Sequence, residues 1–475
     1  MVGLFVALGV VTGLAAAAYT PPGLGDFVGG RFAALPFDDA QPGSPARLCL
    51  ILGARALSGP SCAAGHNAVE ITGLPRGTGA GEVTVADVGD VNGGRFGDIA
   101  VSDSAASFDG RAHSGVTWVV FGTAHPTVIN LAHLGKGGFE IGGPRAGAQT
   151  GVEDESQGPG VGDVSGDGFD SIVLSSRNSP STDSDMAWVV FGKRGDAPVD
   201  LAHLGSDGFE IEGTNGASPT IIGDVTGNGH AAVAISGSGN GQISVVYGSG
   251  SSATVRLGSL GARGFRISGL DSVVGGTIAG VGDLTGDGLA DMLVGNPWSG
   301  GECGPNAPIL TEICPGQAYV IYGERADENI NVQRLGSHGY RIASSSGATD
   351  GLGSTVAAAG DVNGDGRPGL LIGDNAHAYV IFGRAAGGPI DLDKLRQSSC
   401  GFVITFPLPS GIALGPGVGP PVADVGDLTA DGRSDILVEP TSTNGTTTDF
   451  YVVYGKTSSA PVDLAHLGGD GFQIH

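Results

Sequence analysis

A nine-residue acidic, glycine-rich phrase recurs along this chain and limits the folds that the chain can adopt. Clear copies begin at Asp90, Asp163, Asp224, Asp283, Asp361 and Asp427, and a degenerate copy begins at Asp26. Successive copies lie about 60 to 80 residues apart, somewhat longer than typical propeller repeats. A recurrence of this kind indicates seven copies of one structural unit rather than several unrelated domains.

Two more phrases follow each acidic phrase in a fixed order. The first is apolar and usually ends in an aromatic residue and a glycine, as in WVVFG ending at Gly122 and YVIYG ending at Gly323. The second has the pattern GFxI, as in GFEI ending at Ile141. Together with the small-residue stretch before each acidic phrase and the apolar stretch after it, these phrases predict four short strands per repeat.

A four-stranded sheet of this type buries its faces only against neighbouring sheets, so we expect the repeats to form one β-propeller. The predicted fold is all-β, with seven four-stranded blades over residues 19–475 and repeats that start near 19, 82, 155, 216, 275, 353 and 419. The first blade should be the least regular. Its first strand would come from Tyr19–Asp26, which contains Pro21 and Pro22, and proline removes a backbone donor.

The composition fits a folded, glycine-rich β protein. Gly 89 and Pro 26 suit many tight turns, while 40% hydrophobic and 15% charged residues leave apolar surface to bury. The net charge of −25 repels nucleic acid and anionic membranes and favours cations. We therefore expect no nucleic-acid partner. We also expect the protein to be a monomer, because its blades would close into one ring.

The first residues predict export. Residues 2–18 carry no charge and end in a run of alanines, which is typical of a signal peptide cleaved near Ala18. A membrane anchor or a first β-strand is the alternative interpretation of this segment. No later segment is long and apolar enough to span a bilayer. The expected location is therefore secreted or at the cell surface.

The five cysteines fit an exported protein. Cys49 with Cys62, and Cys303 with Cys314, could each close a surface loop through a disulfide, leaving Cys400 over. The fifth repeat is the longest, and the Cys303–Cys314 segment should be an exposed insertion between its second and third strands.

The acidic phrase has the spacing of a calcium-binding loop. Positions 1, 3, 5 and 9 carry side-chain oxygens and position 7 would offer a backbone carbonyl, which suits an ion that takes about six to eight oxygen ligands. The complete copies place these ligands at Asp283, Thr285, Asp287, Leu289 and Asp291, and at Asp427, Thr429, Asp431, Arg433 and Asp435. An EF-hand is excluded, because the twelfth positions hold Val294 and Val438 instead of glutamate.

Other copies of the loop are eroded. Those that keep several candidate ligands have Asp163, Ser165 and Asp167, then Asp361, Asn363 and Asp365, and finally Asp90, Asn92 and Asp98. The copy from Asp224 keeps Thr226 and Asn228 but ends on Ala232. The alternative interpretation is that all of these loops are Asx-turns without a metal, because Asp, Asn and Gly favour tight turns in any case.

The pairing of an aromatic-glycine phrase with a DxNGDGxxD-type loop, repeated in register, resembles the FG-GAP repeats of integrin alpha subunits and their bacterial relatives. The resemblance covers nearly all of the chain after residue 18. It implies a seven-bladed propeller with Ca²⁺ in loops at one face, acting in adhesion or ligand binding outside the cell. Unlike integrins, this sequence continues into no legs or transmembrane helix, which puts a membrane-receptor role in doubt.

The sequence carries no motif of an enzyme active site. His133, His203 and His466 all occupy the same place in an AHLG phrase, so they are expected to be structural repeat residues. The tripeptide Arg194–Gly195–Asp196 could be read by an adhesion receptor if it is exposed. We therefore expect a non-catalytic, calcium-binding adhesion module for an extracellular protein or glycan. The alternative is an extracellular hydrolase or lyase with its active site in the central channel.

Overall fold

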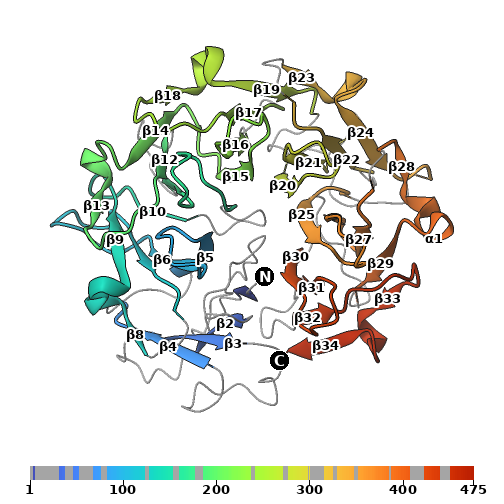
Figure 1. Cartoon of the computed structure of the whole chain (residues 1–475), viewed down its shortest axis with the longest axis horizontal. Helices are drawn as coiled ribbons and strands as arrows, with labels where there is room; N and C mark the ends of the chain where they lie inside the picture. The colour runs from blue at the N-terminus through green and yellow to red at the C-terminus, as the bar shows by residue number, and fades with distance from the viewer. Residues whose placement is uncertain are drawn as a thin grey trace, which may run out of the picture. The chain divides into compact units, whose positions relative to one another are not determined.

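The computed structural model describes the chain in segments. These are residues 4–5, 32–37, 47–52, 68–75, 83–123, 128–152, 160–176, 186–236, 241–270, 277–297, 299, 315–324, 329–346, 351–384, 387–406, 422–438 and 450–474. The chain divides into two compact units, Met1–Pro219 with Gly248–Ser259, and Thr220–Tyr247 with Leu260–His475. Within each unit the strands form separate small sheets, which can be followed by their labels in Figure 1.

The first compact unit holds three of these sheets, numbered here as blades 1 to 3 in chain order. Blade 1 is β1 (Leu4–Phe5), β2 (Phe32–Phe37), β3 (Arg47–Leu52), β4 (Ala68–Thr72) and β8 (Ile129–Asn130). Blade 2 is β5 (Val83–Gly89), β6 (Asp98–Asp103), β7 (Val116–Val120), β9 (Gly138–Gly142) and β13 (Val199–Asp200). Blade 3 is β10 (Thr150–Gly151), β11 (Ile172–Ser176), β12 (Met186–Val190), β14 (Gly208–Glu212) and β18 (Val255–Arg256).

The second compact unit holds blades 4 to 7. Blade 4 is β15 (Pro219–Gly223), β16 (Ala232–Ser236), β17 (Ile243–Val246), β19 (Gly264–Ser268) and β23 (Ile330–Asn331). Blade 5 is β20 (Ile278–Gly282), β21 (Asp291–Asn296), β22 (Gln317–Ile321), β24 (Gly339–Ala343) and β28 (Ile390–Asp391). Blade 6 is β25 (Thr355–Gly360), β26 (Gly369–Gly373), β27 (His377–Ile381), β29 (Gly401–Thr405) and β33 (Val462–Asp463). Blade 7 is β30 (Val422–Gly426), β31 (Asp435–Val438), β32 (Phe450–Val453) and β34 (Gly471–Ile474).

The prediction of a seven-bladed β-propeller is confirmed. In blades 2 to 7, each repeat supplies four antiparallel strands in the predicted order, with the acidic phrase between the first and second strands. In the second compact unit the first strands β20, β25 and β30 contact one another in succession. The four-residue α1 (Leu395–Ser398) is the one α-helix among the described residues.

The sequence did not predict the fifth strand of blades 1 to 6. A two-residue strand from the next repeat pairs in parallel with the fourth strand, as β13 does with β9 and β33 with β29. This strand leads into a one-turn 3₁₀ helix, for example Leu201–His203, in which the N–H of Ala202 donates to the Asp200 side chain. Each of these repeats therefore adds a short strand to the edge of the blade before it.

The aromatic-glycine and GFxI phrases are explained by side-chain packing. In each of blades 2 to 7 the aromatic residue of the first phrase packs on that of the second, with ring centroids 5.9 to 6.1 Å apart. A lysine or arginine directly after three of the aromatic-glycine phrases lies over the GFxI ring of the preceding blade. The pairs are Lys193 with Phe139, Arg384 with Tyr340, and Lys456 with Phe402.

Blade 1 departs from the other blades at its first strand. The segment Tyr19–Asp26, which we expected to supply that strand, lies outside the described residues. The strand at this edge is β1, which pairs in parallel with β2, whereas β5 with β6, β25 with β26 and β30 with β31 pair antiparallel. Cys62, Cys303 and Cys314 also lie outside the described residues, so both disulfides stay predictions. Cys400 is a free thiol.

Candidate functional site

The acidic loops occupy equivalent places in blades 2 to 7, between the first and second strands. A glycine directly before the first aspartate sits at a bulge with positive φ, as at Gly89 (φ +69) and Gly282 (φ +70). A Cβ at Gly89 would lie 2.1 Å from Oδ2 of Asp170 in the next blade, so only glycine fits there. The bulge turns the chain out of the first strand and into the loop.

The loop of blade 5 is the most complete acidic loop. The Asp283 carboxylate accepts the backbone N–H groups of Gly286 at 2.6 Å and Gly288 at 2.8 Å, and a longer bond from Asp287 at 3.2 Å. The Thr285 hydroxyl also donates to Asp283, at 3.3 Å. These bonds hold the pKa of Asp283 below its usual value despite some desolvation. The loop is thus wrapped around an ionised carboxylate.

The aspartate at position 9 of this loop is a buried connector. Asp291 is 0% exposed, and its two oxygens accept the N–H of Leu284 at 2.8 Å and that of Gly323 at 2.9 Å. Gly323 is the glycine of the aromatic-glycine phrase, so this side chain ties the acidic loop to that phrase. Burial, with smaller contributions from the charges of Asp287 and Asp283, raises the pKa of Asp291 to about 6 although these hydrogen bonds lower it.

The loop of blade 7 has the same connector but a different charge balance. Asp435 accepts N–H groups from Leu428 at 2.8 Å and Gly455 at 2.9 Å. At position 7, however, the Arg433 guanidinium donates to the Asp431 carboxylate at 2.7 Å. The ion pair neutralises a predicted calcium ligand, whereas the corresponding residue of blade 5 is the apolar Leu289. The two complete sequence copies are therefore not equivalent.

Blades 2 and 3 share an acidic side chain that sequence spacing did not assign. Asp170, one place before position 9 in its own loop, accepts the N–H of Asp90 in the preceding loop at 2.8 Å. Burial raises the pKa of Asp170 to about 6, and Asp90 and Asp163 add to the effect. In the Asp90 loop, Asp98 accepts bonds from Gly122, Val91 and the Asn92 amide, so this asparagine donates instead of facing a cation.

The remaining copies show polar contacts within the loop. In blade 6 the Asn363 amide donates to Asp365 at 2.9 Å, and Asp361 accepts from Gly364 and Gly366. In blade 3 Asp163 accepts from Gly166 and Gly168, and the Ser165 hydroxyl donates to it at 3.1 Å. In blade 4, Asp224 makes the same backbone contacts although its loop lacks an acid at positions 5 and 9.

Backbone hydrogen bonds join loops of neighbouring blades. The N–H at position 8 donates to the carbonyl at position 1 of the preceding loop, from Asp170 to Asp90 at 3.1 Å and from Ser434 to Asp361 at 2.8 Å. Ala290 makes the same bond to Asp224 at 2.9 Å. Pro368 holds this position in blade 6 and has no N–H to give. These bonds thus join the acidic loops in pairs, blade 2 with blade 3, blade 4 with blade 5, and blade 6 with blade 7.

In this conformation, no three Asp, Glu, His or Cys side chains of the described residues converge closely enough to hold a metal ion. The first and ninth aspartates are instead engaged by backbone N–H groups. The donor set of the Asp283 loop nevertheless fits a hard cation, because its three carboxylates, one hydroxyl and backbone carbonyls are all oxygen ligands. Calcium therefore stays a prediction.

The histidine prediction is confirmed. His133, His203 and His466 each end the same one-turn 3₁₀ helix, and His203 and His466 contact the capping Asp200 and Asp463. They are repeat residues of the blade edge.

The Arg194–Gly195–Asp196 tripeptide lies in an exposed connection between β12 and β13. The Arg194 guanidinium stacks over the Phe169 ring, with its central carbon 5.1 Å from the ring centroid. All three residues of the tripeptide are exposed, and the ring contact holds the arginine side chain against Phe169. Among the described residues, no helix is long and apolar enough to cross a membrane.

The comparisons with known proteins agree with the repeat pattern. The family model of the FG-GAP repeat matches residues 275–307. The FG-GAP match covers β20, the Asp283 loop and β21, the best-formed acidic loop of the chain. No curated protein matches the sequence.

A solved structure of an Agrocybe aegerita lectin, described as recognising non-reducing terminal N-acetylglucosamine, is similar with a TM-score of 0.41 and 17% identity. The alignment covers 94% of this chain and 90% of that chain. A similarity of that size does not indicate a shared ligand.

Proposed function

We propose that the protein is an exported, non-catalytic binding module in which calcium in the acidic loops stiffens an FG-GAP propeller. The observation that supports this most directly is the Asp283 loop. Three carboxylates stand at positions 1, 5 and 9 of this short loop, and no basic residue of the loop balances them. Burial is the main cause of the raised pKa of Asp291, and the charges of Asp287 and Asp283 add to it. An ion would be held by Asp283, Asp287 and Asp291, with the Thr285 hydroxyl and the Leu289 carbonyl.

The bound ion would stabilise the folded protein and would take no part in a catalytic reaction. Without a cation, the crowded carboxylates repel one another, and an ion that binds only the folded loop stabilises that fold by mass action. At millimolar calcium and with the affinity of extracellular calcium modules, one site would contribute about 0.5–1.5 kcal/mol. The rigid loops would then support the connections that contact a protein or glycan ligand.

The proposal is tested by melting temperature in calcium and in chelator. Wild type should melt higher in calcium, and Asp287→Ala should remove most of that gain. Asp431→Ala should remove less, because Arg433 already neutralises Asp431, and Asn228→Ala should change little. Identical wild-type melting in calcium and chelator would mean that the loops are Asx-turns without a metal. Amino-terminal sequencing of the secreted protein would test the cleavage near Ala18.

A further inference from the structure

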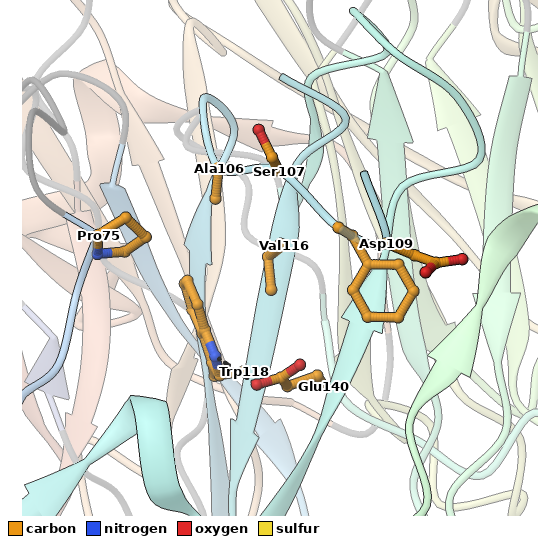
Figure 2. Close-up of a pocket in the computed structure, with 8 residues that line it drawn as sticks. Pro75, Ala106, Ser107, Asp109, Val116, Trp118 and Glu140 are labelled. Carbon is orange, nitrogen blue, oxygen red and sulfur yellow. Dashed lines mark hydrogen bonds between the residues drawn. The ribbon is translucent and has the colours of Figure 1, made fainter. Parts of the chain in front are cut away.

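A hollow of about 480 Å³ lies in the first compact unit, beside the third and fourth strands of blade 2. Figure 2 shows Val116, Trp118 and Glu140 along its floor, Ala106 and Ser107 above them, and Pro75 on the side of blade 1. The volume is in the range of small-molecule sites. Neither the acidic loops nor the proposed calcium function uses these residues.

The floor of the hollow is fixed by the core. Trp118 is 5% exposed and packs in one apolar cluster with Val116, Ala106 and Ile71. Its indole N–H donates to Oε1 of Glu140 at 3.2 Å. The other carboxylate oxygen of Glu140 has no partner among the described residues. A charged oxygen is thus held in place at the edge of an apolar surface.

The wall of the hollow is a braced loop. Arg111 donates to the Asp200 carboxylate at 2.7 Å, to the Pro144 carbonyl at 3.2 Å and to the Phe108 carbonyl at 3.4 Å. The N–H of Phe108 also donates to the Ser114 hydroxyl at 3.1 Å. These bonds fix residues 107–109 beside the floor, and Asp109 lies at the rim of the hollow in Figure 2.

The polar lining accepts hydrogen bonds far better than it donates them. Glu140 and Asp109 are acceptors when ionised, the Trp118 N–H is already used by Glu140, and Ser107 offers the one remaining side-chain donor of the lining. A neutral sugar presents both donors and acceptors, so this lining leaves most sugar acceptors without a partner. An ammonium group presents three donors, no acceptor and a positive charge.

We propose that this hollow binds a primary ammonium group on an aliphatic stem, as carried by a lysine side chain of a protein partner. The stem lies against Trp118, Val116 and Phe108, and the ammonium group meets the Glu140 carboxylate, with Asp109 adding charge at the rim. The net charge of −25 draws such a basic partner toward the protein. This inference rests on the proposed binding function and names the chemistry of the partner.

Indole N–H signals of the protein, labelled with ¹⁵N at tryptophan, test the proposal. The chain has three tryptophans, and Trp118→Phe assigns the signal of interest. The probe is Nα-acetyl-lysine methylamide, compared with Nα-acetyl-norleucine methylamide, which has a similar stem without the charge, and with N-acetylglucosamine. The lysine probe should shift the Trp118 signal in a saturable, salt-sensitive way, and the norleucine probe should not.

Glu140→Gln should weaken the lysine probe about tenfold or more, the size expected for losing a charged hydrogen bond. Glu210→Gln is the control, because Glu210 stands opposite Trp188 in the strand register of blade 3 as Glu140 stands opposite Trp118 in that of blade 2. It should leave binding unchanged. Asp109→Asn, at the exposed rim, should weaken binding less and tests the charge if Glu140→Gln does not fold.

Three results would overturn the assignment. They are equal shifts with the lysine and norleucine probes, a shift with N-acetylglucosamine alone, and no shift with any probe. Calcium-dependent melting is independent of all three, so a failure here is distinguishable from a failure of the proposed calcium function.

Discussion

At the scale of single residues, the aspartates of the acidic loops divide into two roles. Asp287, at position 5, adds a negative charge to the loop. It accepts one hydrogen bond, from the N–H of Leu289 at 2.9 Å. Asp291, at position 9, is fully buried and joins the loop to the aromatic-glycine phrase. Asp291 therefore has a structural role besides its proposed place among the ion ligands, whereas Asp287 has the ligand role alone, and mutation should separate the two roles.

Asp291→Ala should destabilise the protein in chelator as well as in calcium, by about 1–3 kcal/mol, because two buried N–H groups lose their acceptor. Asp287→Ala should have little effect in chelator and a larger effect in calcium. Chemical denaturation of both variants in the two buffers measures the difference. Equal losses for the two variants in chelator would show that position 9 has no special structural role.

The Arg433–Asp431 pair gives a second prediction at this scale. Arg433→Met would release the Asp431 carboxylate while keeping an apolar stem of similar length. The calcium-dependent rise in melting temperature should then increase, because the charge of Asp431 is no longer balanced by an arginine in the Asp427 loop. The matched variant Arg367→Met, at position 7 of the eroded blade 6 loop, should leave the calcium response nearly unchanged. A calcium response that stays at the wild-type value in Arg433→Met would contradict the idea that Arg433 competes with calcium for the Asp431 carboxylate.

At the scale of elements, blades are joined by layers of side chains as well as by strands. Lys456 follows the aromatic-glycine phrase of blade 7 and lies 4.7 Å from the centroid of the Phe402 ring in blade 6. Burial lowers the pKa of Lys456, and Asp470, 3.5 Å away, opposes this shift. Each such cation covers an aromatic pair from the side of the next blade.

Lys456→Met should cost about 0.5–2 kcal/mol of unfolding free energy, since it keeps the apolar stem but removes the cation–π contact. Lys136→Met is the control, because Lys136 is exposed in a 3₁₀ helix of blade 2. Its effect should be close to zero. Urea denaturation of both variants provides the measurement, and equal effects would argue against a stabilising stack.

At the scale of the whole molecule, charge opposes the fold. Lys+Arg 23 against Asp+Glu 48 gives −25, and the acidic loops of blades 2 to 7 carry part of this excess. Salt screens repulsion between exposed charges. In chelator, the melting temperature should therefore rise with sodium chloride, and calcium should act at far lower concentration than sodium does. A melting temperature that falls with added salt would mean that attractive ion pairs dominate instead.

The sequence by itself determined the seven repeats, the four strands of each and the place of the acidic loops, because these depend on local alternation, glycine turns and spacing. It also placed His133, His203 and His466 as repeat residues. These features need only the order of residues along one repeat.

Only the tertiary structure decided the fifth strand, the buried connector role of Asp291 and the pairing of Arg433 with Asp431. The contact of Asp170 with the preceding loop and the hollow beside Trp118 also arise where separate repeats meet. Each of these depends on which side chains of distant residues come within a few ångströms. Spacing within one repeat carries no information about such distances, because they are set by how neighbouring sheets pack.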